Sequence, residues 1–480
     1  MHSAFPTVTV VGAGLAGSEA ALQLAARGVP VRLLEMRPAR QTPVHKGGLP
    51  AELVCSNSLK SRDASTAAGS LKYELAAMGS QLLQCAWETQ VAAGGALAVD
   101  RTLFSRAVAE RLHGSGLVQL VCEECTQLPT GPAIIATGPL TSEALAGQLR
   151  AAVGAESLAF YDAAAPIVEA SSLDGSIVFA QSRWGKGGAS DYLNAPFSRE
   201  EYEAFVHELV GADRVIEKDF ERRELFSACQ PIEEVARTGV DALAHGALKP
   251  VGLSDPRTGR RPWAVAQLRA ENAQATAYNL VGFQTNLRFA EQERVFRMVP
   301  GLQHAEFSRY GVMHRNTFLD APHVLTPTLA LPAAPQVHFA GQVTGTEGYC
   351  EAIASGLFSA LAVYAQLAGL PAPQLPVDSL FGCLMAYATD PATQGYQPMH
   401  VNYGIVAPVQ PKIRNKRERK AAYARRARAA IDAFVAQRAD LFANALPSGA
   451  AALTRSREAA ARELAGLDGT EAPTAGGGAR

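Results

Sequence analysis

The sequence predicts an α/β fold in which a Rossmann-like domain, assembled from both ends of the chain, is interrupted by an α+β insertion domain. Three observations predict it. Residues 8–35 have the pattern of a buried strand, a glycine-rich turn, a helix and a second strand. Two further apolar strands that end on glycine follow far apart, at residues 133–139 and 337–341. Since strands alternating with helices favour a parallel sheet, all three segments are expected to share one sheet and one ligand.

The first strand, residues 8–11, is an apolar run too short for a helix, which is typical of a buried strand. It leads into Gly12, Gly14 and Gly17, which have the G-x-G-x-x-G spacing. The first glycine permits a tight turn, the second lets the backbone approach a pyrophosphate, and the third lets the helix lie close to the strand. The helix of residues 16–27 would then present its amino-terminal N–H groups to the phosphates.

A second strand, residues 31–34, ends at Glu35, where an acidic side chain is expected to hold the ribose hydroxyl groups. A glycine triplet by itself is a weak signal, and a glycine-rich turn in some other α/β protein is the alternative. Because the strand, helix, second strand and terminal acid are all in register, the stretch predicts a dinucleotide site.

The two later strands are expected to return the chain to the same sheet. Residues 133–139 close on Ala-Thr-Gly, and Gly138 would let the backbone pass the dinucleotide. Residues 337–341 repeat the pattern and precede a Gly/Thr-rich turn and a long helix, whose start near Thr346 and Gly348 would supply backbone donors to a second part of the ligand. This arrangement is typical of an FAD-binding domain of the two-dinucleotide-binding flavoprotein type.

The expected cofactor-binding residues lie at these junctions: Gly12, Ala13, Gly14, Leu15, Ala16, Gly17, Glu35, Gly138, Gly341, Gln342, Thr346 and Gly348. The expected domains are residues 1–156 and 327–446 for the two parts of the FAD-binding domain and 157–326 for the insertion, with a disordered tail over 447–480. No second strict G-x-G-x-x-G is present, so a nicotinamide reductant would have to dock transiently.

Composition and charge bound the class of protein. An apolar content of 48% with 19% charged residues is ordinary for a globular protein, and a net charge of −1 means that any nucleic-acid-binding surface must be local. The seven cysteines are scattered and odd in number, which does not suit a disulfide framework. The first strand leaves no room for a signal peptide, and no uninterrupted apolar run is long enough to span a bilayer. We therefore expect a cytoplasmic protein with reduced thiols.

Residues 71–87 and 102–112 are expected to form helices. Cys122 and Cys125 make one C-x-x-C, but zinc usually needs a second pair or a histidine pair at matching spacing, and none follows. We expect no metal site.

Two other cysteines have surroundings that could carry chemistry. Cys55 precedes a Ser-Asn-Ser stretch of helix-capping residue types, so a helix is expected to start there, and the positive end of its dipole would favour a thiolate. Cys229 precedes Gln230-Pro231, where the proline favours an irregular segment near the surface. Burial as a small hydrophobic residue is the alternative for both.

A basic stretch lies near the end of the globular part. Residues 411–428 hold nine Lys or Arg against one acid, Glu418. On a helix these charges would form a local positive field able to bind phosphates, and a solvated charged face is the alternative. The candidate contacts to a nucleic acid are Lys412, Arg414, Lys416, Arg417, Arg419 and Lys420.

Several motifs, spread over residues 7–428, together resemble one family. They are VGAGLAGSEAA, VCSNSLKS, IIATGPLTS, RRPWAVAQLRAEN, YNLVGFQT, RYGVMHRNTFLDAP, FAGQVTGTEGYCEAIASG and VNYG. The chain is similar to the folate- and FAD-dependent tRNA (uracil-5-)-methyltransferases, the TrmFO family, which make ribothymidine in the T-loop of tRNA. MHRNTF and GTEGYCEAIASG also resemble the tRNA wobble-uridine modifying flavoprotein MnmG/GidA, a longer relative with an extended C-terminal helical domain.

The resemblance implies the reaction and its participants. Reduced FAD, with NAD(P)H as reductant, takes a one-carbon unit from 5,10-methylenetetrahydrofolate and passes it to carbon 5 of a uracil in the T-arm of tRNA. Carbon 5 is a poor nucleophile until a thiolate adds to carbon 6, so the chemistry needs a cysteine and a base. By resemblance, Cys229 in SACQPIEE is the nucleophile and Cys55 in VCSNSLKS protects it or transfers a proton. Which cysteine has which role stays open.

The resemblance also points to residues around the folate and the flavin. His314 could stack on the pteridine, and Arg315, beside Asn316, could pair with the glutamate carboxylates. Tyr349 could cover the flavin ring. Plain burial is the alternative for the histidine and the tyrosine. Gln342 departs from the aspartate that such flavoproteins often have after the last strand, although its amide can still donate and accept hydrogen bonds.

Three other functions are compatible with the motifs. One is a small-molecule FAD oxidoreductase, which would have no need of the basic stretch. The second is the wobble-uridine modification, and the third is a non-catalytic flavoprotein that binds RNA and assists its folding. Loss of catalysis without loss of tRNA binding on changing Cys229 would exclude the last.

Overall fold

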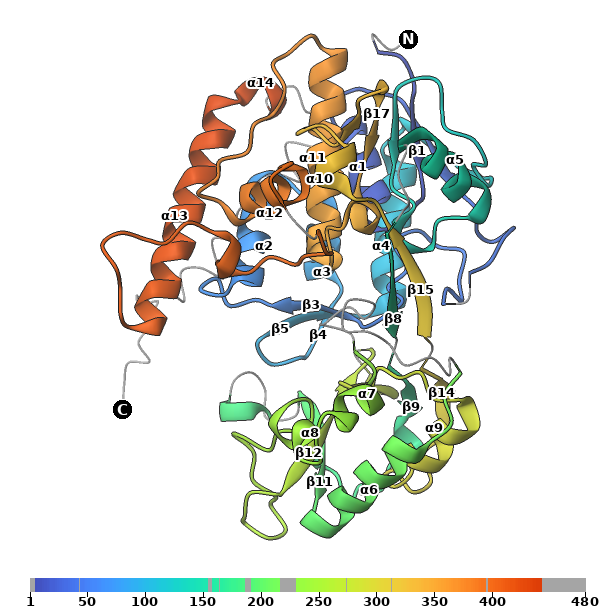
Figure 1. Ribbon diagram of the computed structural model, residues 1–480, viewed down its shortest axis with the longest axis vertical. Coiled ribbons are helices and arrows are strands. Elements are labelled where there is room, and N and C mark those ends of the chain that lie inside the picture. Colours follow the sequence, from blue (N-terminus) through green and yellow to red (C-terminus); the bar gives the residue numbers. More distant parts are fainter. Residues whose placement is uncertain are drawn as a thin grey trace, which may run out of the picture.

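The computed structural model describes residues 5–42, 44–153, 158–163, 165–185, 191–215, 230–272, 274–311, 313–393 and 396–442. Two hydrophobic cores are present among them. The larger is built from residues before 154 and after 317, and the smaller from residues 165–305. In Figure 1 the part of the chain with the smaller core lies below the larger part, as green and yellow ribbon. The predicted α/β architecture with an insertion is confirmed. The boundaries at 156/157 and 326/327 stay predictions.

The larger part is organised around a six-stranded sheet in the order β16-β17-β7-β1-β2-β6. Its strands are β1 (Val8–Val11), β2 (Val31–Glu35), β6 (Val118–Cys122), β7 (Ala133–Ile135), β16 (Ala330–Leu331) and β17 (Ala334–Phe339). All adjacent pairs are parallel except β16 with β17. Val10 lies opposite Leu33 on one side and Ile134 on the other. Such short, continuous apolar runs suit strands covered on both faces.

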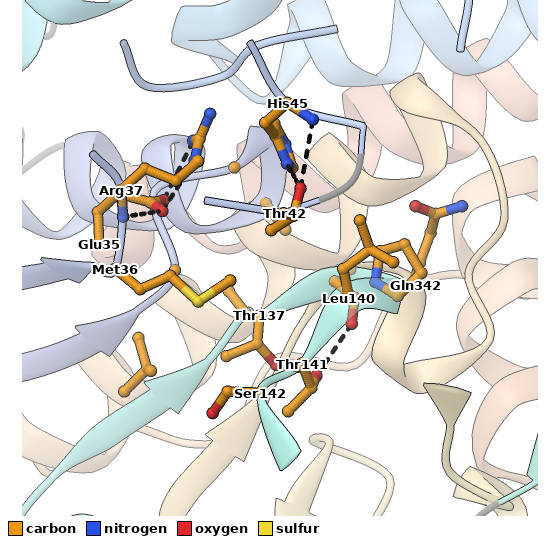
Figure 2. A pocket seen from close by; sticks show the side chains of 18 of the residues that line it. Glu35, Met36, Arg37, Thr42, His45, Thr137, Leu140, Thr141, Ser142 and Gln342 are labelled. Atoms are coloured by element: carbon orange, nitrogen blue, oxygen red, sulfur yellow. Dashed lines mark hydrogen bonds and ion pairs between the residues drawn. The ribbon is translucent and has the colours of Figure 1, made fainter. Parts of the chain in front are cut away.

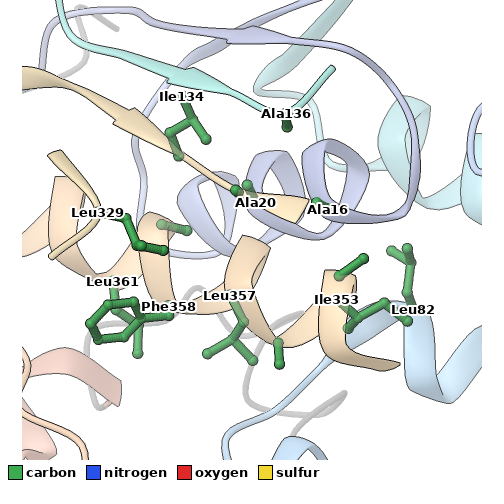
Figure 3. Close-up of a cluster of buried hydrophobic side chains, with 14 of the residues drawn as sticks. Ala16, Ala20, Leu82, Ile134, Ala136, Leu329, Ile353, Leu357, Phe358 and Leu361 are labelled. Atoms are coloured by element: carbon green, nitrogen blue, oxygen red, sulfur yellow. The ribbon is translucent and has the colours of Figure 1, made fainter. Parts of the chain in front are cut away.

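Two helices cross beneath this sheet in close contact. They are α1 (Leu15–Ala25) and α11 (Tyr349–Leu367), and Figure 3 shows Ala16 and Ala20 of α1 above Ile353 and Leu357 of α11. Among the described helices, α11 alone is long and apolar enough to cross a membrane, and 89% of its apolar window is buried inside the protein. Its apolarity is that of a core helix.

The expected single helix over residues 71–87 is wrong. The structure has α2 (Ala67–Ala77) and α3 (Gln81–Glu88), separated at Gly79, whose φ of 81° ends the first helix, while Ser80 caps the second. The helix expected over 102–112 is present as α4 (Arg101–Gly114). A small sheet, β3-β5-β4, lies beside them, formed by β3 (Ser58–Ser61), β4 (Gln90–Val91) and β5 (Ala96–Val99).

The insertion is an antiparallel sheet with helices. Its order is β10-β11-β12-β13-β9-β14, from β9 (Ile167–Glu169), β10 (Phe179–Ala180), β11 (Tyr192–Phe197), β12 (Ala264–Ala270), β13 (Ala277–Val281) and β14 (Phe307–Arg309). Its helices are α6 (Arg199–Gly211), α7 (Ile232–Arg237), α8 (Ala242–His245) and α9 (Phe289–Phe296). The helix α6 begins with a capping box between Ser198 and Glu201. A two-stranded ribbon, β8 (Leu158–Ala163) with β15 (Met313–Phe318), joins the insertion to the rest (Figure 1).

Among its described residues, the larger part has five further α-helices. They are α5 (Glu143–Val153), α10 (Ala321–Val324), α12 (Leu380–Thr389), α13 (Lys416–Gln437) and α14 (Ala439–Phe442). The longest, α13, forms one edge of the molecule in Figure 1 and is attached to α2 through Tyr73, whose hydroxyl donates to Asp432 at 2.7 Å. The tail expected to be disordered, residues 447–480, lies entirely outside the described residues.

A candidate dinucleotide cleft and its surroundings

A cleft of about 1070 Å³, counted with the space at its open mouth, lies at the carboxyl ends of β1, β2, β7 and β17. This is the edge at which parallel α/β sheets bind ligands. Eight of the expected residues line it: Gly12, Gly14, Leu15, Ala16, Glu35, Gly138, Gly341 and Gln342. Figure 2 shows Glu35 on one wall, Thr137 and Thr141 on the β7 side and Gln342 opposite. The structure thus brings the three distant strand-to-glycine junctions together.

The first glycine turn has the shape of a phosphate cradle. A methyl group added at Gly14 would meet no protein atom within 4 Å, so the missing side chain leaves free space in the cleft. Gly14 is also the N-cap of α1 and provides no side-chain cap, which leaves the first N–H groups of the helix to a ligand. These features fit the diphosphate of a dinucleotide such as FAD.

The other two glycines of the motif serve the backbone itself. Gly12 has a φ of 98°, and a methyl group at Gly17 would lie 1.8 Å from the Gly12 carbonyl oxygen. Four of the expected residues therefore support the cleft without lining it, namely Ala13, Gly17, Thr346 and Gly348. The Thr346 hydroxyl, for example, donates to the Gly341 carbonyl at 2.9 Å.

Glu35 is fixed at the rim by two partners. It accepts a hydrogen bond from the Ala13 N–H at 2.9 Å and forms an ion pair with Arg37 at 2.9 Å. Burial alone would raise the pKa of Glu35, but the hydrogen bonds and the charge of Arg37 outweigh it and the pKa is lowered. The carboxylate thus stays ionised and remains able to accept hydrogen bonds from ribose hydroxyls.

The loop between β2 and β3 contributes residues that the sequence patterns did not indicate. Arg37, Thr42, His45 and Glu52 all line the cleft. The Arg37 side chain bridges Glu35 and Glu52, the latter at 3.0 Å, and His45 Nδ1 lies 2.6 Å from the Thr42 hydroxyl. Burial, followed by the charge of Arg37, lowers the pKa of His45 to about 4. The only signal in the sequence is the run of charged residues in a Pro/Gly-rich connection, which has no periodicity to interpret.

Gln342 lies on the cleft wall and is held in place from behind. Its amide donates to both carboxylate oxygens of Glu347 at 2.7 Å. The amide oxygen is left to face a ligand, which is how the side chain could replace the usual aspartate.

Cys55 lies in an irregular segment that precedes a strand, and the predicted helix start beside it is wrong. The Ser-Asn-Ser stretch leads into strand β3, and the next helix, α2, begins only at Ala67, with Thr66 as its cap. The Tyr349 hydroxyl holds this segment by accepting from the N–H groups of Cys55 and Ser56 at 3.0 and 3.1 Å. The half-exposed thiol therefore owes its surroundings to tertiary neighbours and not to a helix dipole.

Tyr349 is the first residue of α11 and lines the cleft, next to Val54. Burial raises the pKa of its phenol, followed by the influence of Cys55. The hydroxyl therefore stays protonated and both donates and accepts at the Cys55 segment, since it also donates to the Ser56 carbonyl at 2.9 Å.

Several expected residues fall wholly or partly outside the described part of the chain. Cys229 does not belong to the described residues. His314, Arg315 and Asn316 lie on β15, opposite Asp162, Tyr161 and Phe160 of β8, but their side chains are not described. Cys122 ends β6 and Cys125 lines the cleft, and no cluster of His, Cys, Asp and Glu able to hold a metal occurs among the described residues.

The basic stretch forms the first half of α13 and one wall of a groove. The opposite wall is the loop of Asp63, Ala64 and Ser65, between β3 and α2. Five cations line the groove, Lys416, Arg417, Lys420, Arg425 and Arg428. In the described part of the chain none of the five forms an ion pair with a carboxylate. Of the other expected contacts, Lys412 and Arg414 are exposed, and Arg419 donates to the Ile413 carbonyl at 3.2 Å.

Known proteins similar to this chain agree with this architecture. The glucose inhibited division protein A family matches residues 7–371. Two proteins named methylenetetrahydrofolate–tRNA-(uracil-5-)-methyltransferase TrmFO, from Pelotomaculum thermopropionicum and Geobacter sulfurreducens, are each 52% identical over 89% of this chain and cover 98% and 99% of their own length. A crystal structure of Aquifex aeolicus GidA covers 94% of this chain and 78% of its own at a TM-score of 0.68 and 14% identity, which supports the fold alone.

Proposed function

The chain belongs to the glucose inhibited division protein A family and, by its identity to them, to the methylenetetrahydrofolate–tRNA-(uracil-5-)-methyltransferases, and from this premise we infer that it methylates uridine in tRNA. The observation that carries the inference is identity of 52% over almost the full length of both relatives. The cleft, shaped for a dinucleotide, agrees with it.

We propose the following participants. The carbon donor is 5,10-methylenetetrahydrofolate, the cofactor is FAD, the reductant is NADH or NADPH, and the target is carbon 5 of a uridine in the T-arm, which becomes ribothymidine. The reaction would take place in the cytoplasm. When bound, the flavin supplies the redox chemistry and carries the one-carbon unit.

The residues of the cleft would bind and orient the cofactor. Gly14 and the start of α1 would hold the diphosphate, and Glu35, kept ionised by Arg37, would hold the ribose hydroxyls. Tyr349 and Gln342 line the cleft and would contact the flavin, and the Tyr349 hydroxyl also holds the Cys55 segment. His314, Arg315 and Asn316 are proposed for the folate by resemblance.

The two cysteines are proposed for the chemistry on uracil. A thiolate that adds to carbon 6 turns carbon 5 into a nucleophile, and a base then removes the proton from carbon 5. We assign the addition to Cys229 and the protection of that thiol or the proton transfer to Cys55. The position of Cys55 beside the cleft supports its part in this assignment.

The tRNA is proposed to bind along α13. The support is the set of cations in the groove against residues 63–65, which have no carboxylate partner among the described residues, because such charges attract phosphates. Lys412 and Arg414 would extend the contact beyond the helix start.

The test is methyl transfer in a defined mixture. The flavin-loaded protein is incubated with NADPH, 5,10-methylenetetrahydrofolate and an unmodified tRNA transcript, and the digested RNA is analysed for ribothymidine by mass spectrometry. Product is expected only when folate and reductant are both present. A transcript whose T-loop uridine is replaced by cytidine is the control. Modification at the wobble position instead, or no product from well-folded flavin-loaded protein, would reject the inference.

A further inference from the structure

The backbone that carries Cys55 is held by side chains from both parts of the molecule. Arg101, at the start of α4, donates through Nη1 to the Leu53 carbonyl at 2.5 Å. Arg309, at the end of β14 in the insertion, donates to the Val54 carbonyl. Cys55 therefore lies where the two cores meet, and its placement depends on both.

The same contact concentrates positive charge. Glu271 is buried and pairs with Arg101 at 2.5 Å. Arg269, only 7% exposed, donates to Asn57 Oδ1 at 2.7 Å, and Arg309 donates to a carbonyl. Within the described part of the chain, Glu271 is the one carboxylate that forms an ion pair with any of these three guanidinium groups. Buried cations in excess are costly unless an anion lies nearby.

Among the described residues, charged and titratable groups near the Cys55 segment come from three elements and one loop. Arg101 comes from α4, Arg309 from β14 and the phenol of Tyr349 from α11, while Lys46 on the loop before the segment adds another cation. Burial, followed by the charge of Arg101, lowers the pKa of Arg309, and Tyr349, Cys55 and Glu271 act in the opposite direction.

The nearby carboxylates are already engaged. Glu271 is held by Arg101, and Glu52 accepts from Arg37 and from the N–H groups of Lys46 and Gly47. Within the described part of the chain neither carboxylate forms an ion pair with Arg309, whose guanidinium is hydrogen-bonded to the carbonyl of Val54, the residue before Cys55. A thiolate at Cys55 would place an anion next to this cation.

We propose that Arg309, together with Arg101, is a positioning residue that stabilises the Cys55 side chain as a thiolate and fixes it at the edge of the dinucleotide cleft. The proposal rests on the proposed function, because a cysteine that serves as nucleophile or base acts in its deprotonated form. It gives the insertion a definite role: by bringing Arg309 to Val54, it sets the protonation state of a thiol carried by the other domain.

The test is the pH dependence of Cys55 alkylation in the FAD-loaded protein. Iodoacetamide labelling of the Cys55 peptide is timed by mass spectrometry at each pH. The unchanged protein should show a midpoint below the value of about 8.5 for a free cysteine. In Arg309→Met the midpoint should rise by about one unit, so that labelling at neutral pH slows about tenfold, while the plateau rate at high pH is unchanged.

Two further variants separate charge from structure. Arg309→Lys retains the charge and should keep the midpoint of the unchanged protein. Arg309→Gln retains a donor for the Val54 carbonyl without the charge and should shift the midpoint as Arg309→Met does. If Arg309→Met does not fold, Arg309→Gln provides the same test of the charge. The matched control is Arg183→Met, because Arg183 is a half-buried insertion residue that donates to the Val251 carbonyl at 2.7 Å and leaves the Cys55 segment untouched.

An unshifted midpoint in Arg309→Gln, or a midpoint near that of a free cysteine in the unchanged protein, overturns the proposal. A changed plateau rate of Cys55 labelling with an unshifted pH midpoint also overturns the proposal, because Arg309 would then have a structural role only. Labelling needs neither tRNA nor folate. Failure of methyl transfer would therefore reject the proposed function while leaving this result to stand or fall independently.

Discussion

Gly14 is the residue at which a single missing side chain matters to the ligand and not to the protein. A methyl group there would enter free space in the cleft, whereas at Gly17 it would lie 1.8 Å from a backbone oxygen. Substitutions at these two glycines are therefore expected to have different effects on ligand binding and on folding. A substitution at Gly14 should abolish ligand binding, and a substitution at Gly17 should prevent folding.

Replacement of Gly14 by valine is expected to give folded protein that does not retain FAD. The side chain would occupy the space of the diphosphate, and overfilling of this kind costs about 1–3 kcal/mol, which is a loss of about 5- to 150-fold in affinity. Flavin absorbance of the purified variant and the Kd for added FAD measure the effect. The thermal unfolding of the apoprotein should match that of the unchanged apoprotein, and undiminished yellow colour would contradict the assignment of this turn.

His45 is expected to make the stability of the protein depend on pH in the acidic range. Its pKa is 6.5 in the unfolded chain and about 4 in the folded protein, so between these values the unfolded chain binds a proton that the folded protein does not. The contribution of His45 to the free energy of unfolding should therefore be complete above pH 6.5 and should decrease as the pH falls toward 4. Each pKa unit is worth at most about 1.4 kcal/mol, and less for a partly exposed ring.

Urea unfolding of the unchanged protein and of His45→Gln, over a series of pH values, checks this expectation. The variant should lose the part of the slope that lies between the two pKa values. Glu35, whose pKa is lowered, contributes stability above its unfolded value of 4.5 and loses it below, so its effect cancels in the comparison. Equal slopes in the two proteins would show that the ring is not buried in solution.

At the scale of elements, the contact between α1 and α11 sets the position of the cleft. A methyl group at Gly356 would lie 2.2 Å from the Ala16 carbonyl oxygen. The backbone of α1 at Ala16 therefore packs directly against α11 at Gly356, with no room for a side chain between them. Ala16 also lines the cleft. Movement of α11 would consequently shift the helix start that faces the ligand.

We expect Gly356→Ala to lower the free energy of unfolding by about 1–3 kcal/mol and to weaken FAD binding as well, because α1 must move away from α11. Gly114→Ala is the matched control, since Gly114 ends α4 and an added methyl group there meets nothing within 4 Å. Denaturant unfolding and FAD titration of both variants measure the two effects. A Gly356→Ala protein as stable as the control would contradict this helix contact.

The elements themselves were predictable wherever a pattern is local. The strand, turn and helix of residues 8–25 follow from apolar periodicity and glycine spacing. The prediction of one helix from residue 71 to 87 was wrong at Gly79. The apolar pattern continues through this position, but the backbone there has a positive φ that ends the first helix. The helix start expected at Cys55 failed because capping residue types also occur at strand starts, as at β3.

At the scale of the whole molecule, charge is distributed unevenly over a nearly neutral chain. The net charge is −1, yet five cations without carboxylate partners in the described part of the chain face one groove between α13 and the 63–65 loop. The loop leads back through β3 to Cys55. A nucleic acid held in this groove would therefore be connected to the proposed chemical site by a short stretch of chain.

The triple variant Lys416→Gln, Arg417→Gln and Lys420→Gln removes three charges from the groove. It should bind tRNAs of any sequence more weakly, and its binding should be less sensitive to salt. For every phosphate that the variant no longer binds, the slope of log K against log salt should become shallower by about 0.7–0.9. Filter binding or fluorescence anisotropy over a salt series measures it. Arg199→Gln and Arg294→Gln form the control, because these cations are already paired with Glu203 and Glu291. An unchanged slope would place the tRNA elsewhere.

The sequence alone determined the dinucleotide turn and the basic helix, because each depends on spacing within one short stretch. It also determined the split of the domain around an insertion, because a short strand that ends on glycine recurs at three distant places in the chain. The surroundings of Cys55 were decided only by the tertiary structure. Arg101, Arg309 and Tyr349 come from three distant elements, and their arrival at one segment leaves no periodicity in the chain. Local sequence fixes which backbone conformations are accessible, whereas the electrostatic environment of a thiol is the sum of charges that only folding brings together.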